Sequence, residues 1–203
     1  RLTHLFSETL SGYGAVFGEY ARYNDVFGTR DFTTAGARAG LVWDTRDNET
    51  DATKGFYLSA EAEPFHEFTY ANTAVKAVGE ARAYVAPGDG QRVVLAARIK
   101  AGMLAGMPIA ETPPDKLFFA GGGGSVRGYG YKSIGVPTPL GLVGGRSLFE
   151  TSAEIRFKAT DTIGIVAFAD GGAVGPRATP DFSDMRFGAG LGLRYYTALG
   201  PIR

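Results

Sequence analysis

The sequence predicts an all-β fold, an antiparallel transmembrane β-barrel, on three observations. Apolar residues recur at every second position in eight segments, which is the period of a β-strand and not of a helix. Short turns join some of these segments, and one long connection covers residues 107–146, an alternation typical of membrane barrels. No run approaches 18 apolar residues, which excludes a transmembrane helix but not spanning strands of about 9–11 residues.

The eight expected strands follow one another from residue 12 to residue 195. The clearest covers residues 33–43, where Thr, Ala, Leu and Trp alternate with Thr, Gly, Arg and Val. The first strand, by contrast, follows the pattern less regularly. In chain order the expected strands are residues 12–22, 33–43, 56–63, 73–85, 93–103, 149–158, 163–170 and 187–195. No segment shows the helical period, so we expect no helix.

Each expected strand has one uniformly apolar face and one face that carries charges of both signs. A soluble β-sandwich also alternates, but its dry core would have to bury these mid-strand charges at a high cost. A barrel instead turns the apolar face to lipid and the charged face to a wet lumen, and we prefer this interpretation. Aromatic residues near the strand ends agree with interfacial girdles: Trp43, Phe56, Phe65, Tyr84, Phe149, Phe157 and Tyr195.

The connections suggest which end of the barrel faces which compartment. Residues 87–90 (PGDG) and 159–161 read as tight turns, which barrels place on the periplasmic side, and we expect the other connections to be longer. Residues 44–55 form a longer polar turn on that same side. Its carboxylates lack the spacing of an EF-hand calcium loop, so we expect them to cap the turn.

Composition excludes several classes of function. The 21 basic and 21 acidic residues balance, whereas a nucleic-acid-binding protein needs a basic excess, so no nucleic-acid partner is expected. The absence of Cys excludes disulfides, thiolate catalysis and zinc fingers. The only two histidines, His4 and His66, are far apart in the sequence, which leaves little for a metal site or a Ser-His-Asp triad. We therefore expect no enzyme activity and no cofactor.

The long connection contains the most distinctive residues of the chain. Its centre, residues 118–135, reads FFAGGGGSVRGYGYKSIG. Four consecutive glycines are not a Walker A loop, because no Gly-Lys-Ser/Thr follows, and the dinucleotide fingerprint lacks its strand and helix. The segment is too rich in aromatic residues for a disordered loop, so we expect it to pack against the lumen wall.

These residues resemble the VRGF/Y signature of the outer-membrane protein assembly superfamily, which includes BamA, TamA and two-partner secretion transporters. Residues 125–135 (SVRGYGYKSIG) are most similar to the TamA branch. The second motif of the family, Phe-x-Asp-x-Gly, is matched at residues 168–172 (FADGG). Three further segments also resemble TamA: residues 43–48 (WDTRDN), 144–148 (GGRSL) and 188–203 (GAGLGLRYYTALGPIR).

The resemblance implies that the long loop folds back into the barrel, where its Arg contacts acidic residues of the lumen wall. The alternation independently places Asp170 and Glu154 on the lumen face, where Arg127 would bind both carboxylates. The loop residues assigned to this lock are Ser125, Val126, Arg127, Gly128, Tyr129 and Tyr131, and the wall residues are Asp170, Glu154, Phe168 and Gly172. Gly128 is expected to allow a backbone turn, and the two tyrosines to pack. The alternative is that Arg127 is a solvated loop cation with no specific contact to the wall.

Three other charged residues share the inward face of the same strand as Glu154. We expect Glu150, Arg156 and Lys158 to solvate the lumen and not to form specific contacts.

The resemblance also implies that residues 1–203 are part of a larger protein. We expect them to form the seventh to fourteenth strands of a sixteen-stranded barrel, without the first strands, the last two strands and the periplasmic POTRA domains. An eight-stranded closed barrel would be too narrow to contain the long loop.

The function implied is that of an insertase or translocase in the Gram-negative outer membrane. The expected partners are outer-membrane lipids, unfolded outer-membrane protein clients and a TamB-like periplasmic protein that assists autotransporter assembly. The alternatives are a BamA-type general insertase, a two-partner secretion transporter and, in a different class, a passive porin-like channel.

Overall fold

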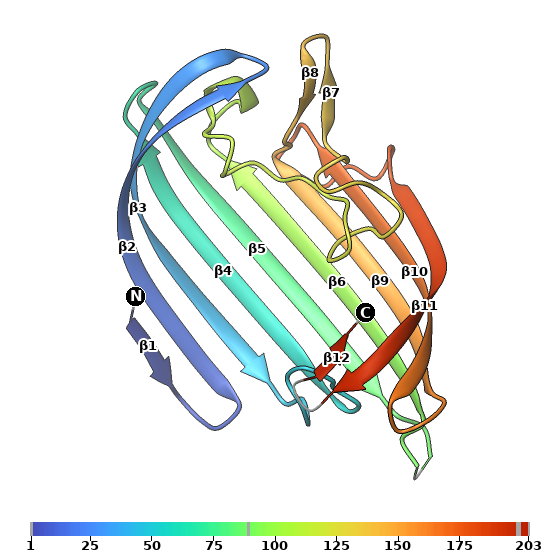
Figure 1. Cartoon of the computed structure of the whole chain (residues 1–203). Coiled ribbons are helices and arrows are strands. Elements are labelled where there is room, and N and C mark those ends of the chain that lie inside the picture. The colour runs from blue at the N-terminus through green and yellow to red at the C-terminus, as the bar shows by residue number, and fades with distance from the viewer. Residues whose placement is uncertain (1, 89, 198–199, 203) are drawn as a thin grey trace.

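A strongly curved antiparallel sheet forms the wall of the molecule (Figure 1). The structure is a computed structural model that describes residues 2–88, 90–197 and 200–202. Ten strands are hydrogen-bonded in the order β1-β2-β3-β4-β5-β6-β9-β10-β11-β12. Over the described residues this sheet does not close into a barrel, and β1 and β12 are its two edge strands. In that part of the chain, no helix has the length and apolarity that crossing a membrane requires.

All eight expected strands are present, and most are longer than the sequence pattern suggests. They are β2 (Leu10–Asp25), β3 (Gly28–Asp44), β4 (Gly55–Glu67), β5 (Asn72–Val85), β6 (Val93–Ala105), β9 (Ser147–Lys158), β10 (Ile163–Gly175) and β11 (Arg186–Thr197). The count of eight omits the short edge strands β1 (Leu2–Leu5) and β12 (Gly200–Ile202). Runs of three or four residues are too short to display an alternation, so sequence reasoning missed them.

The long connection has short elements of its own. A hairpin of β7 (Val136–Thr138) and β8 (Gly141–Val143) projects at the end of the sheet where the loop begins, and the 3-10 helix η1 (Ile109–Glu111) lies near the start of the loop (Figure 1). The all-β expectation is confirmed, and the only helical element among the described residues is this single 3-10 turn. It was missed because three residues do not establish a helical period.

Two connections expected to be long are tight hairpins. β2 and β3 pair up to Asp25 and Gly28, and β4 and β5 are joined by residues 68–71. The apolar alternation fades before β2 and β3 end, because most residues of both faces are polar near that hairpin. Arg22 and Asp31, on adjacent strands, form an exposed ion pair with Nε and Oδ1 2.6 Å apart. Strand pairing thus continues past the segment that the sequence pattern marks.

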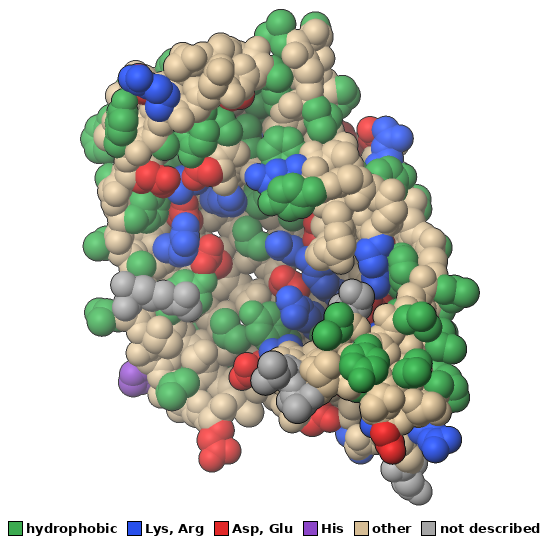
Figure 2. All heavy atoms as spheres, viewed as in Figure 1, with side chains coloured by type: hydrophobic (Ala, Val, Ile, Leu, Met, Phe, Trp, Pro, Cys, Tyr) green, Lys and Arg blue, Asp and Glu red, His purple; other side chains and the backbone are tan. Residues whose placement is uncertain are grey.

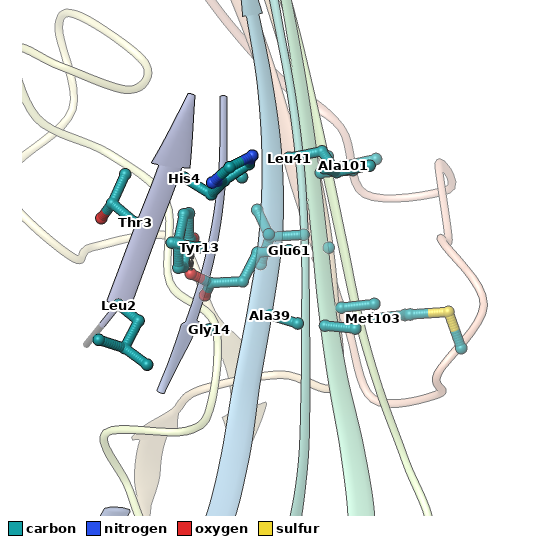
Figure 3. Close-up of a pocket in the computed structure, with 18 of the residues that line it drawn as sticks. Leu2, Thr3, His4, Tyr13, Gly14, Ala39, Leu41, Glu61, Ala101 and Met103 are labelled. Carbon is teal, nitrogen blue, oxygen red and sulfur yellow. Dashed lines mark hydrogen bonds between the residues drawn. The ribbon is translucent and has the colours of Figure 1, made fainter. Parts of the chain in front are cut away.

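The two faces of the sheet are sorted as the barrel interpretation predicts. Large apolar side chains are exposed on the convex face, where Leu191 is 79% exposed. Charged side chains gather in the hollow of the concave face (Figure 2), and several are buried there: Glu63, Glu67, Glu150, Arg156, Asp170 and Arg194. In a close-up, Tyr13 and Glu61 point toward each other on one side of the strands while Met103 extends on the other (Figure 3).

The hydrophobic core lies between the long loop and the concave wall. Phe118 and Val126 of the loop pack with Phe65, Leu104 and Leu148 of the strands, and all five are buried. A Cβ at Gly102 would lie 2.6 Å from the ring of Phe118, so this strand position accepts the loop only because it has no side chain. The loop therefore lines the lumen, as its aromatic content predicts.

The polar turn between β3 and β4 also folds against the wall. Asp47 accepts hydrogen bonds from the backbone N–H groups of Thr53 at 2.9 Å and Lys54 at 3.1 Å, so the predicted capping role is confirmed. The turn is docked onto distant strands by Arg194, whose Nη1 donates to Oδ1 of Asp51 at 3.1 Å, and by Arg156, which donates to the carbonyl of Ala52.

The capping bonds make this turn sensitive to acid. Partial burial acts to raise the pKa of Asp47, but hydrogen bonds from Thr53 and Lys54 outweigh it, so the pKa lies below its ordinary value. The ionised carboxylate therefore stabilises the turn above the usual Asp pKa of about 4, and this stabilisation is lost as the pH falls through the lowered value.

We expect the amide chemical shifts of Thr53 and Lys54 to titrate with a midpoint below that of an ordinary Asp. Asp47→Asn should abolish this titration, while Asp161→Asn, at an exposed turn of the same end, should leave it unchanged. An unaltered titration in Asp47→Asn would show that another group controls the turn.

Candidate functional site

Three adjacent strands build the wall against which the loop docks. The pairing of β9 with β10 sets Glu154 opposite Phe168 and Ser152 opposite Asp170. The pairing of β10 with β11 sets Gly188 opposite Asp170. Because strand side chains alternate between faces, all of these positions share the concave surface.

Arg127 is held on this wall by two carboxylates. Its Nε and Nη2 lie 2.6 Å from Oδ2 and 2.7 Å from Oδ1 of Asp170, and its Nη1 lies 2.6 Å from Oε1 of Glu154. Its backbone N–H donates to Oδ2 of Asp170 at 3.0 Å, and Nη2 donates to Ser152 at 3.1 Å. The guanidinium also lies over the ring of Phe168, 3.7 Å from its centroid. The solvated-cation alternative is therefore wrong.

This arrangement requires a guanidinium. The Asp170 side chain is 0% exposed and receives a bidentate pair of bonds, which the single ammonium of Lys does not reproduce. Burial acts to lower the pKa of Arg127, but the hydrogen bonds to Asp170 and Glu154 outweigh it and raise this pKa above its ordinary value. Arginine is protonated at physiological pH, so the bonds from Arg127 to both carboxylates are charge-assisted.

A second contact holds the residues just before Arg127. The hydroxyl of Ser125 donates to Glu150 and accepts from the backbone N–H of Gly121 at 2.9 Å. Arg98 joins this contact, because its Nη2 lies 2.7 Å from Glu150 and its Nη1 donates to the carbonyl of Gly124. We call Arg127, Asp170, Glu154, Ser125 and Glu150 the loop clamp.

The expectation that Glu150 and Arg156 only solvate the lumen is wrong. Glu150 binds Ser125 and Arg98, and Arg156 donates to Glu154 through Nε at 2.7 Å. Both residues are buried, so each needs a partner for its charge. Their position on the same face as Glu154 was visible in the alternation, but which partners they meet depends on the loop.

Two strand glycines leave space for Val126 and Arg127, which we call the loop tip. A Cβ at Gly172 would lie 2.5 Å from Cγ2 of Val126, which is 0% exposed, and a Cβ at Gly188 would overlap the carbonyl oxygen of Arg127. Sequence reasoning included Gly172 through its motif and missed Gly188. Gly188 was visible only as one of the regularly spaced glycines of the expected strand 187–195.

The two tyrosines of the motif differ in their surroundings. Tyr129 packs against the core cluster, and its hydroxyl donates to the carbonyl of Phe187 at 3.3 Å. Tyr131 is 82% exposed, so its expected packing is wrong. The chain turns at Lys132, which has a φ of 56°, and Tyr131 lies outside the docked part of the loop.

A third anchor, absent from the predicted site, holds the beginning of the loop. Buried Lys116 lies with Nζ 2.9 Å from Oε1 of Glu63 on β4, and Arg38 on β3 binds the same carboxylate. Neither Lys116 nor Glu63 belongs to a motif. Only the alternation, which turns Glu63 inward, could have marked one of the two partners.

The backbone at Gly128 supplies a separate test of the clamp. Its φ is +92°, and a Cβ there would meet open space, so a substitution adds backbone strain without a clash. We expect Gly128→Ala to weaken loop docking by about 1–3 kcal/mol, seen as faster protease cleavage of the loop. Gly123→Ala, in the same loop and also facing open space, should have little effect. Equal cleavage of the two variants would contradict this reading of Gly128.

The cavity beside the clamp is polar and about 400 Å³ in volume, and Arg98, Arg127 and Glu154 are among its lining residues. A larger, mostly apolar cavity of about 1140 Å³ runs beside β1 to β6 and contains no clamp residue (Figure 3). Among the described residues, no group of three or more acidic or His side chains is arranged to hold a metal ion.

The chain as a whole can be compared with known protein families. Residues 11–203 match the family model described as the Omp85 superfamily domain. The chain belongs to the Omp85 superfamily. Membership indicates a β-barrel protein of the Gram-negative outer membrane, and it agrees with the fold and the faces described above.

A solved structure shows how this Omp85 chain relates to a longer relative. It is similar to the crystal structure of BamA from Haemophilus ducreyi lacking POTRA domains 1-3, with a TM-score of 0.79 and 16% identity over 98% of this chain. The match covers 47% of that protein, so this chain spans about half its length. At this identity the likeness establishes the fold of the barrel wall.

Proposed function

We propose that this Omp85 chain is part of an outer-membrane protein insertase or translocase. The observation that carries the proposal is the loop clamp, which binds the long loop against the concave wall of a barrel of this superfamily. The proposed action is non-covalent and needs neither a cofactor nor nucleotide hydrolysis. Its clients are unfolded outer-membrane proteins, and its surroundings are outer-membrane lipids.

The mechanism follows from what the clamp does to the wall. Arg127 joins β9 to β10 through Glu154 and Asp170, and the loop adds buried apolar contacts to β4 and β6. This region therefore has extra bonds beyond its strand pairing and resists deformation. A barrel that opens elsewhere to admit a client strand needs such a rigid region, and the incoming strand would pair with an exposed sheet edge.

Within the superfamily we propose a TamA-like role in autotransporter assembly, with a TamB-like periplasmic protein as partner. The support is the motif SVRGYGYKSIG at residues 125–135. A BamA-type general insertase or a two-partner secretion transporter would use the same clamp, and the general insertase is an outcome of the test below.

Reconstitution of the complete protein into liposomes tests the proposal. An unfolded outer-membrane barrel client and an autotransporter are added separately, and folding is followed by heat-modifiable migration on gels. We expect faster client folding than in empty liposomes, and slower folding with Arg127→Ala. Preference for the autotransporter supports the TamA-like role, and equal acceleration favours the general insertase.

Planar-bilayer conductance separates the insertase from a passive porin-like channel. The clamped loop predicts small, flickering currents, because it occupies the concave side of the wall. Large stable openings with no acceleration of client folding would overturn the proposal.

A further inference from the structure

The connection between β10 and β11, residues 176–185, lies on the outer face of the wall. It joins these strands at the end of the sheet where the long loop also lies (Figure 1). Phe182 of this connection packs edge-on against Phe149 of β9, with the ring centroids 5.0 Å apart. A Cβ at Gly171 of β10 would lie 2.6 Å from Cε of Met185. The alternation places Phe149 and Gly171 on the convex face, so we call residues 176–185 the outer loop.

The charged side chains of the outer loop are paired close to the loop itself. Nη2 of Arg177 lies 3.1 Å from Oδ2 of Asp181, and Nη2 of Arg186, at the start of β11, lies 2.8 Å from Oδ1 of Asp184. Phe182, between them, is 55% exposed. A paired charge is less costly to bring near hydrocarbon than a single charge. The outer loop thus combines locally balanced charge with an exposed apolar ring, which suits the boundary between lipid headgroups and hydrocarbon.

The apolar cavity of about 1140 Å³ extends from the outer loop across the convex face, and we call this part of it the outer groove. Residues 178–180 line it, and Phe149, which the outer loop contacts, is paired with Ala101 of β6. The outer loop therefore closes the β6 end of the groove. The floor consists of small outward-facing residues of β3, β4, β5 and β6, which are Ala39, Ala60, Ala62, Ala77, Gly79 and Ala101.

The strand register makes this floor a recess. Its residues form two neighbouring rows across the strands. Leu58 and Ile99, which are 40% and 50% exposed, stand in the next row on one side, and Val75, which is 43% exposed, stands in the next row on the other. Met103 extends from the same outward face (Figure 3). Because alanine and glycine have the smallest side chains, the surface between these larger residues is hollowed.

We propose that the outer groove holds one acyl chain of an outer-membrane lipid, whose headgroup lies beside the outer loop. The groove crosses β3 to β6, and a strand spacing of about 4.8 Å gives it a length of roughly 14 Å. One leaflet supplies half of a hydrocarbon core of about 30 Å, so an extended acyl chain has nearly the same length. The groove is also continuous with the convex face, which meets lipid in an outer-membrane barrel of this superfamily.

An acyl chain suits the groove better than a second copy of this protein does. The charged groups of the outer loop bind one another, and the floor presents only methyl groups and glycine. Neither offers a directional contact that would select a protein partner. An acyl chain needs only apolar surface, which the floor supplies.

Photocrosslinking in nanodiscs tests the proposal with the complete protein. The nanodiscs contain phosphatidylcholine, part of which carries a photoactivatable diazirine on one acyl chain, and labelled peptides are identified by mass spectrometry. Leu191 and Leu193 of β11 are 79% and 72% exposed and lie outside the groove, so passing lipid contact labels β11 most strongly. An acyl chain held in the groove instead concentrates the label on β4 and the outer loop.

Filling the groove should remove this label. We expect Ala77→Leu on β5 to lower the labelling of β4 and the outer loop by about threefold or more, because the added side chain occupies the floor. Phe182→Ala, which removes the contact with Phe149, should also lower the labelling of β4. Ala189→Leu is the matched control, because it adds the same side chain at an outward-facing position of β11 outside the groove, and it should be labelled as the wild type is.

Heat-modifiable migration checks that each variant is folded before labelling. Stronger labelling of β11 than of β4 in the wild type, or equal labelling of β4 in Ala77→Leu and the wild type, would overturn the proposal. A dimer in detergent that Ala77→Leu abolishes, measured by light scattering, would assign the groove to a second copy of the protein and overturn it as well. The assay measures no client folding, so its result is independent of the proposed insertase activity.

Discussion

Replacing Arg127 with alanine is expected to detach the long loop from the barrel wall and to destabilise the folded protein by about 3–5 kcal/mol. The substitution leaves Asp170, whose side chain is 0% exposed, without the bidentate partner that balances its charge. Glu154 loses one of its two arginine partners and retains Arg156. The loss should therefore fall mainly on β10 and the loop tip.

Urea unfolding followed by heat-modifiable migration measures this loss, and limited proteolysis of residues 107–146 reports loop release. Arg127→Lys should lie between the wild type and Arg127→Ala, because it restores the charge without the fork. In the double variant with Asp170→Asn, the combined loss should be smaller than the sum of the two single losses. Strict additivity would contradict a direct bond between the two side chains. Arg186→Ala, which removes an exposed arginine, is the control.

Adding one methyl group at Gly188 is expected to displace the loop tip without touching any charge. That methyl would overlap the backbone carbonyl oxygen of Arg127, and a backbone atom cannot move aside as a flexible side chain can. Overpacking of this kind costs about 1–3 kcal/mol. Gly188→Ala should therefore produce the protease sensitivity of Arg127→Ala while Arg127 is still present.

The matched control is Gly14→Ala, at a strand glycine whose Cβ would meet nothing within 4 Å. It changes strand propensity in the same way but introduces no clash. If Gly188→Ala and Gly14→Ala had the same protease resistance, close approach of the loop backbone to β11 would be refuted.

The wall was largely predictable from the sequence because its physics is local. Alternation along one strand reports which side chains share a face, and this alone assigned Asp170 and Glu154 to the lumen. The strand ends were less predictable. Beyond the apolar segment both faces are polar, so the continuation of β2 and β3 to their tight hairpin left no periodic trace.

Some contacts of the loop could likewise be predicted from the sequence, and others could not. The resemblance of residues 125–135 and 168–172 to two family motifs identified Arg127 and Asp170. Glu154 was identified by its place on the inward face of the preceding strand, where the family has its second acidic partner. Lys116 with Glu63, and Ser125 with Glu150, join positions far apart in the chain and belong to no shared periodic pattern. Tyr131 belongs to the motif yet is exposed, since a motif records residue types and not the direction of each side chain.

By itself the sequence determined the class of the protein, the two faces of its strands and the central bond of its loop. The faces depend on short-range periodicity, and the bond was found through two separate short motifs that resemble a known family. The tertiary structure alone decided where the loop backbone touches β11, which carboxylates are shared, and that Arg194 is buried with two nitrogens that have no hydrogen-bond partner among the described residues. These properties arise from the distance between segments up to 143 residues apart, and that distance is set only when the sheet curves and brings its turns and loop onto one surface.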